Sequence, residues 1–262
     1  MFVNNPFAEL SALISPGIMK AYVALMILLV IGGTLFDIMH KGSAKYFFEN
    51  WRNSQKRGAK KVKSGKVAAL AAQTAASEVL TSSEFCNSHR RIAHLLTMYG
   101  FIAFVISTFV MVFCYSSSTT PTPWIWPFLW TIGALMICAG GYWFWFFIRV
   151  DVAAEGNSPF RIVRADLFVL SLIAMATMAL IWSIAQSFGV SGFSNFFFIL
   201  FIFAATVLFA GVPWSKFAHM FFKPAAALQK RVAQADGSRN NLPAPANKPE
   251  IFSSIRRLPR NY

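Results

Sequence analysis

Five long stretches of apolar residues run through the chain, and polar or charged segments separate them. They lie at about 17–39, 92–115, 125–148, 165–187 and 195–215. Each has roughly the 20 residues that a helix needs to cross the hydrocarbon core of a bilayer. Lipid offers no partner for open backbone groups, and none of the stretches alternates like a barrel strand. The pattern therefore predicts an all-α integral membrane protein with a bundle of five transmembrane helices.

Composition supports this class of protein. Of the 262 residues, 56% are hydrophobic and only 13% are charged, whereas a soluble domain has about 25% charged residues. The basic residues follow the first apolar stretch, which argues against a cleaved signal peptide. The three cysteines, Cys86, Cys114 and Cys138, have no CxxC spacing. They predict neither an iron–sulfur cluster nor a zinc site.

The distribution of positive charge predicts the orientation of the chain. Eleven of the 24 Lys and Arg residues lie between Lys41 and Arg91, and nine lie from Lys216 to the end. Because positive residues stay on the cytoplasmic side, the N-terminus is predicted outside and the C-terminus in the cytoplasm. The net charge of +14 is interpreted as this topology signal together with attraction to anionic lipid, and no nucleic-acid partner is predicted. A docking face for an acidic soluble partner is the second interpretation.

The segments outside the membrane divide the chain into three predicted parts. Residues 1–16 form an outer N-terminal tail, and residues 17–230 form the membrane domain, which includes a cytoplasmic loop at 40–91. Residues 231–262 are predicted to be a disordered basic tail. Within the loop, "HKGSAKYFFENWRNSQKR" is typical of an interfacial amphipathic helix. The alanine-rich "VAALAAQTAASEVL" that follows favours a second helix.

The four histidines all lie near the predicted cytoplasmic boundary. His40 ends the first span, His89 precedes the second, and His94 lies about one turn inside it. His219 follows the fifth span and is predicted to continue the same helix beyond a kink at Pro213. A b-type haem in a helix bundle needs two imidazoles at matching depth on facing helices. His94 and His219 fit that requirement.

The residues around this pair are consistent with a haem site. Candidate partners for the haem propionates are Arg90, Arg91, Lys216 and Lys223. His89 and His94 are five residues apart, about 140° around a helix, so both cannot face one iron. Histidine at a membrane boundary is also common as an amphipathic residue without any ligand. From the residues alone, both interpretations stay open.

Two segments carry a resemblance to a known family. "HRRIAHLLTMYGF" opens the second span and "VPWSKFAHMFFKPAAALQKR" closes the fifth. They resemble the membrane subunits of the nitrate reductase gamma family, which includes the haem b subunits of heterodisulfide reductase, over roughly residues 17–230. The small chain with "FDIMHKGSAKYFFENW" after the first span is most similar to the membrane anchors of dissimilatory adenylylsulfate reductases.

The resemblance implies electron transfer in the bacterial cytoplasmic membrane. A cytoplasmic iron–sulfur and flavin oxidoreductase would dock on loop 40–91 and the C-terminal tail and exchange electrons with quinone. The family pattern places two histidines on the second span and two on the fifth, and His94 and His219 match the inner pair. The outer pair would fall near Phe104 and Phe201, so the resemblance implies one haem b, whose iron is the only metal expected. No catalytic residue is predicted.

With a single haem, quinone would react near the cytoplasmic side, where Asp37, His40 and His89 are candidate hydrogen-bonding or proton-donating groups. Asp37 lies within i,i+3 reach of His40. It is either paired structurally, with Arg149 or Lys41, or a proton donor to reduced quinone. Two alternatives to the electron-transfer function remain: a haem-free docking anchor for a soluble redox enzyme, and a small transporter or channel.

Overall fold

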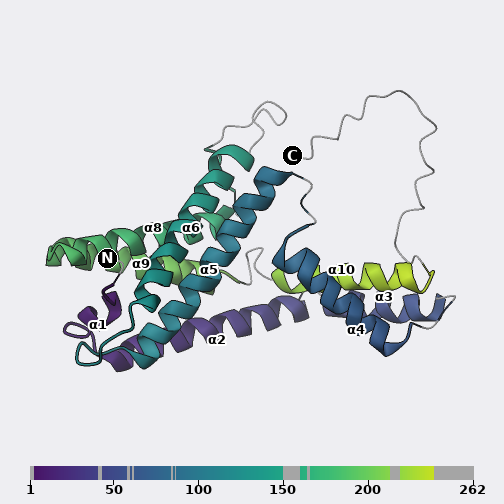
Figure 1. Ribbon diagram of the computed structural model, residues 1–262, viewed down its shortest axis with the longest axis horizontal. Coiled ribbons are helices and arrows are strands. Elements are labelled where there is room, and N and C mark those ends of the chain that lie inside the picture. The colour runs from purple at the N-terminus through teal and green to yellow at the C-terminus, as the bar shows by residue number, and fades with distance from the viewer. Residues whose placement is uncertain are drawn as a thin grey trace. The chain divides into compact units, whose positions relative to one another are not determined.

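The computed structural model describes residues 3–40, 43–57, 60, 62–83, 85, 87–149, 160–163, 166–212 and 219–238. All regular elements in these ranges are helices (Figure 1). The chain divides into two compact units. The first comprises residues 1–35 and 89–217, and the second comprises residues 36–88 and 218–262. Each unit is described by itself.

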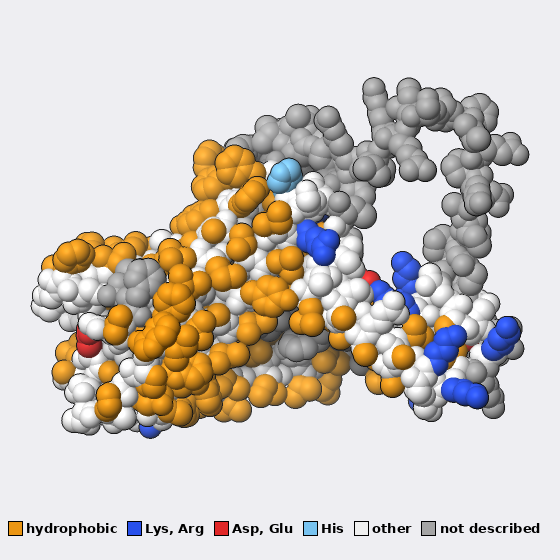
Figure 2. Space-filling model, in the orientation of Figure 1, with side chains coloured by type: hydrophobic (Ala, Val, Ile, Leu, Met, Phe, Trp, Pro, Cys, Tyr) orange, Lys and Arg blue, Asp and Glu red, His pale blue; other side chains and the backbone are white. Residues whose placement is uncertain are grey.

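Five helices are long and apolar enough to cross a membrane, which confirms the predicted spans at nearly the predicted bounds. They are α2 (Pro16–His40), α5 (Ser88–Cys114), α6 continued by the π-helix η2 (Ile125–Ile148), α8 (Leu167–Ser187) and α9 (Ser191–Ala210). Most of the coloured side chains on the visible face of the first unit are apolar (Figure 2). The described part of the chain is therefore all-helical, and its five long apolar helices are compatible with a multi-pass membrane protein.

The fifth span ends earlier than predicted. The amide of Gly211 bonds to the carbonyl of Val207 at 3.0 Å, which closes the last turn of α9 at Ala210. His219 begins a separate helix, α10 (His219–Ala235). The prediction that His219 continues α9 on one kinked helix is therefore wrong. The sequence shows a physical reason, since Gly211 and Pro213 follow this end of α9 and both residue types are unfavourable in a helix interior.

Helices α5 and α6 pack at the distance that glycine allows. A Cβ added at Gly100 would lie 2.7 Å from the carbonyl oxygen of Gly133, and one added at Gly133 would lie 2.7 Å from the carbonyl oxygen of Gly100. One added at Gly140 would lie 2.5 Å from the carbonyl oxygen of Ala93. Small residues at helix contacts let backbones approach closely in membranes, where no hydrophobic force drives helices together.

Helices α8 and α9 form an antiparallel hairpin, and α2 lies against α9. The indole of Trp182 on α8 stacks on Phe201 of α9, with ring centroids 5.7 Å apart. The hydroxyl of Tyr22 on α2 shares a hydrogen bond with Thr206 of α9 at 3.0 Å. Such bonds between polar side chains replace the water that the bilayer lacks.

The N-terminal segment belongs partly to the core of the first unit. Asn5 caps the short helix α1 (Pro6–Leu10) by accepting from the amides of Phe7 and Ala8, and its Nδ2 donates to the carbonyl of Tyr115 at 2.9 Å. The ring of Phe7 lies 5.3 Å from that of Trp182 and is 4% exposed. Within the predicted outer tail, α1 thus closes one end of the bundle.

The second unit is also helical. It contains α3 (Ser43–Arg57), α4 (Ser64–Thr74), the π-helix η1 (Ala75–Leu80) and α10. Both helices expected in loop 40–91 are confirmed. Buried Asp236, just after α10, accepts hydrogen bonds from the Ser54 hydroxyl at 3.2 Å and from the Ser238 amide at 2.7 Å.

The boundary predicted between 230 and 231 falls inside α10. The last turn of α10 and Asp236 therefore belong to the packed unit and not to a tail. The predicted disorder beyond residue 238 lies outside the described residues.

Candidate functional site

His89 and His94 lie in the first two turns of α5, in the first unit, and both are exposed. Ala93 between them is 1% exposed, because it packs against Gly140 of α6. The ring of His89 lies 5.9 Å from the ring of Trp143 at the end of α6. His94 is about 100° around the helix from Ala93. The two histidines therefore lie on different sides of α5.

His94 lies on the side of α5 that contacts α9. The rings of Phe104 and Phe201 lie 6.4 Å apart, and those of Phe101 and Phe209 lie 6.3 Å apart. These contacts show that α5 and α9 are antiparallel, so the C-terminal end of α9 faces the N-terminal half of α5. His94 is seven residues from Phe101, on the same helix face and about 10 Å further along. The chain thus leaves α9 toward the level of His94.

Arg90 and Arg91 are half-buried in the same turn of α5. They lie four and three residues before His94, and side chains at these spacings are neighbours on a helix surface. The structure therefore brings three of the predicted site residues together within the first unit. They form one basic patch around an exposed imidazole at the end of a membrane-spanning helix.

Asp37, His40, His219 and Lys223 belong to the second unit. Asp37 is 3% exposed in the last turn of α2, and the ring of His40 stacks on Phe36 with centroids 5.4 Å apart. The ammonium of Lys223 on α10 lies 5.3 Å over the ring of Phe85. The side chain of His219 and all of Lys216 lie outside the described residues. The pairing of His94 with His219 stays a prediction.

Arg149, one of the two candidate partners for Asp37, has a carboxylate partner that the sequence analysis missed. Its guanidinium forms a two-point ion pair with Asp166, in which Nε donates to Oδ1 at 2.7 Å and Nη2 donates to Oδ2. It also donates to the carbonyl of Arg161 at 2.6 Å and lies 4.1 Å over the ring of Trp145. The only signal in the sequence was the position of Arg149 and Asp166 at the two ends of a polar loop.

Aromatic side chains fill the depth at which the family pattern has its outer histidines. Phe104 stacks on Trp130 with centroids 5.1 Å apart, and Phe201 stacks on Trp182. All four side chains are at most 5% exposed. A second haem does not fit these residues, since the rings pack on one another and none of them offers a nitrogen that can ligate iron.

Larger metal sites are absent from the part of the chain that the structure describes. No group of three or more His, Cys, Asp or Glu side chains gathers there. A haem iron with two axial ligands does not need three protein side chains, because the porphyrin supplies the other four ligands. This result therefore leaves the one-haem prediction as it stands.

Comparisons with family models, curated proteins and solved structures found no match for this chain. Function is therefore argued from the chain's own residues. These observations establish a five-span helical protein with a basic histidine patch at one end of α5.

Proposed function

We propose that the protein is a membrane anchor and electron-transfer subunit that links a cytoplasmic iron–sulfur and flavin oxidoreductase to the quinone pool through one haem b. The observation that carries this proposal is the position of His94. Its imidazole is exposed about one turn inside a membrane-spanning helix, next to Arg90 and Arg91, on the side toward which the chain leaves α9. The resemblance supports adenylylsulfate reductase as the partner enzyme.

In this proposal the protein's own residues hold and orient the cofactor. His94 and His219 would hold the haem iron through their imidazoles, and Arg90, Arg91, Lys216 and Lys223 would pair with the propionates. When bound, the haem supplies reversible one-electron transfer. Asp37, His40 and His89 donate or accept the protons that accompany quinone reduction. The substrate of any such reaction is quinone, and the partner enzyme performs the chemistry on sulfur.

The orientation in this proposal follows the distribution of Lys and Arg. The second unit and the end of α5 that carries His94 face the cytoplasm, in a bacterial inner membrane. The described loop 115–124 between α5 and α6 contains no Lys or Arg, which supports its position on the outer side.

A haem-free docking anchor is the second candidate function. The packed cluster of Phe104, Phe201, Trp130 and Trp182 favours it, because these rings occupy the depth at which a transmembrane relay would need its second haem. Transport ranks last. Intramembrane ionisable groups mark most ion and substrate pathways, and residues 92–114, 125–148 and 167–212 contain no Asp, Glu, Lys or Arg.

The deciding experiment is a dithionite-reduced minus oxidised spectrum, with haem quantitation, of protein purified in mild detergent. We expect a b-type signal near one haem per chain. The variants His94→Ala and His219→Ala should lose it, whereas His89→Ala, a matched change on the α6 side of α5, should keep most of it. Loss of the signal in His89→Ala alone would overturn the ligand assignment. If wild-type protein made with ample haem supply contains no haem, the haem-free docking anchor would be the remaining candidate function.

A further inference from the structure

An open groove of about 830 Å³ runs between α10 and the α4–η1 segment within the second unit. We call it the α10 groove. On α10 it is lined by Lys223, Ala226, Ala227, Lys230, Arg231, Gln234 and Ala235. The first six of these residues have the spacing i, i+3, i+4, i+7, i+8, i+11, which is one continuous face of a helix. Leu70, Gln73 and Glu78 form the opposite wall.

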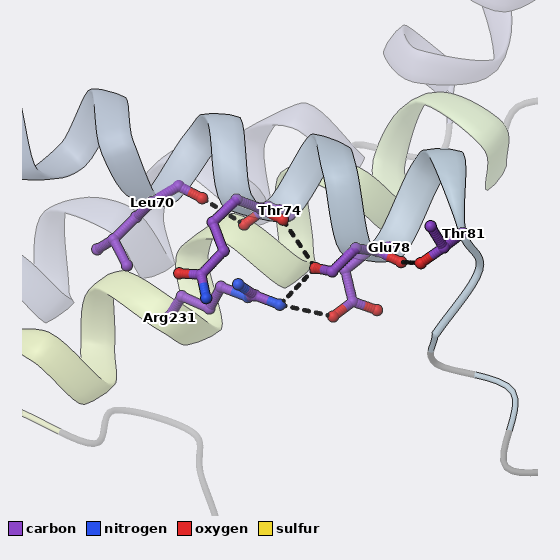
Figure 3. A network of polar contacts seen from close by, with 7 residues as sticks. Leu70, Thr74, Glu78, Thr81 and Arg231 are labelled. Atoms are coloured by element: carbon purple, nitrogen blue, oxygen red, sulfur yellow. Dashed lines mark hydrogen bonds and ion pairs between the residues drawn. The ribbon is translucent and has the colours of Figure 1, made fainter.

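Arg231 holds the two walls together. Its guanidinium donates to the Ser77 hydroxyl at 2.7 Å and to Glu78 Oε1 at 3.0 Å (Figure 3). In the same view Thr74 and Thr81 bond back to carbonyls one turn earlier, Thr74 to Leu70 at 2.7 Å and Thr81 to Ser77 at 2.8 Å. These bonds satisfy both hydroxyls locally within the α4–η1 segment. The hydrogen bonds of Arg231 therefore connect the α10 wall to the α4–η1 wall.

The charge that the α10 groove presents is positive. Among the described lining residues, Glu78 is the only acidic one, and Arg231 already neutralises it. Lys223 and Lys230 are exposed at the rim, while Ala226 and Ala227 make a floor of small side chains. The groove thus combines a shallow apolar floor with cationic edges.

We infer that the α10 groove is the docking site for an acidic helical segment of the soluble partner enzyme. Eleven residues of α10 separate the two ends of the stripe, which corresponds to about 17 Å or three turns of a helix. A helix laid in a groove of this length presents small apolar residues to the floor and carboxylates to the lysines at the rim. This inference rests on the proposed function, since it names the contact surface for that function's partner.

Charge excludes the nearest competing occupant, the chain's own C-terminal segment. Residues 239–262 contain five Lys or Arg residues and one acidic residue, Glu250. A basic segment is repelled by a basic rim, so electrostatic complementarity favours an acidic partner supplied in trans. An anionic lipid headgroup is also negatively charged, but it is too short to need a groove of three helical turns.

The test uses the full-length protein in detergent and a fluorescently labelled alanine-based peptide of about three turns with glutamates on one face. Binding is followed by fluorescence anisotropy. Lys230→Glu should weaken binding about tenfold or more, because it places like charges together. Ala226→Leu fills the floor without changing the charge and should weaken binding to a similar extent. The matched controls are Arg161→Glu, before α8 in the first unit, and Ala72→Leu on α4. Both lie outside the lining of the groove and should bind as wild type does.

Three results would overturn the inference. The first is an equal loss of binding in Lys230→Glu and Arg161→Glu, which would show non-specific attraction. The second is unchanged binding in Ala226→Leu. The third is competition by soluble short-chain phosphatidylglycerol that depends on Lys230, which would make the groove a lipid site. Haem content is measured on the same preparations. If the wild-type protein contains no haem, this would count against the electron-transfer function. The peptide-binding result would still decide whether the α10 groove is a docking site.

Discussion

Arg149 combines three kinds of contact in the first unit: a two-point ion pair with Asp166, a hydrogen bond to a backbone carbonyl and a position over the ring of Trp145. Both charged side chains of the pair are only 12% exposed. Water therefore stabilises either charge poorly once its partner is removed. This makes the pair a structural clamp between the end of α6–η2 and the start of α8.

Arg149→Met should destabilise the protein by about 3 kcal/mol, because it leaves the Asp166 carboxylate buried without its partner. We expect a clear fall in the temperature at which the protein in detergent loses its monodisperse peak on size-exclusion chromatography. The double variant Arg149→Met with Asp166→Asn should recover part of the loss, since no unpaired charge remains. A double variant with fully additive losses would show that the two residues act independently.

At the scale of single residues, the candidate site was readable from the sequence only in part. The spacing of Arg90, Arg91 and His94 predicts their common location, because they lie within one turn of one helix. The partner of Arg149 was not predictable, since Asp166 is 17 residues away along the chain and two other acids, Asp151 and Glu155, are nearer in sequence. Hydropathy indicates which residues enter a membrane, but it does not indicate which charged side chains pair at the membrane boundary.

At the scale of elements, the contact between α5 and α6 depends on glycines. Cβ atoms at Gly100 or Gly133 would lie within 2.7 Å of backbone oxygens on the opposing helix, and backbone cannot move aside as a flexible side chain can. Gly32 on α2 offers the matching control, because a Cβ there would meet nothing within 4 Å.

Gly133→Ala should therefore force the two helices apart and cost about 1–3 kcal/mol. Gly32→Ala should be neutral or stabilising by up to about 1 kcal/mol, because alanine favours the helix without meeting a neighbour. Thermal unfolding of both variants, followed by tryptophan fluorescence in the same detergent, measures the difference. If both variants unfold at the same temperature as the wild-type protein, the contact at Gly133 is not tight in the folded protein.

The elements themselves were predictable to different degrees. The five spans follow from hydropathy, because crossing lipid demands a long apolar helix. Helix α1 was not predicted, since five residues are too few to form a helix without tertiary contacts. Its formation depends on the Asn5 cap and on the burial of Phe7 against Trp130 and Trp182.

At the scale of the whole molecule, the positive charge is concentrated on the second unit and on the described end of α5. Lys and Arg side chains gather on the visible face of the second unit (Figure 2). From this distribution the positive-inside rule predicts an orientation in which the second unit faces the cytoplasm.

This orientation predicts the behaviour of reporter fusions. A green fluorescent protein fused after Tyr262 should fluoresce, whereas alkaline phosphatase at the same position should be inactive, because the C-terminus stays in the cytoplasm. A phosphatase fused after Ser118, in the loop between α5 and α6, should be active. An active phosphatase at Tyr262 would reverse the orientation and place His94 on the outer side of the membrane.

The sequence by itself determined that this is a five-span helical membrane protein with a basic, helical segment outside the membrane, because the bilayer imposes length and hydropathy on each span. Only the tertiary structure decided that α1 packs into the core, that Arg149 pairs with Asp166 and that α4, η1 and α10 line a basic groove. Each of these depends on residues far apart in the chain. Whether such residues contact one another depends on how the helices pack, and the local sequence pattern does not specify that packing.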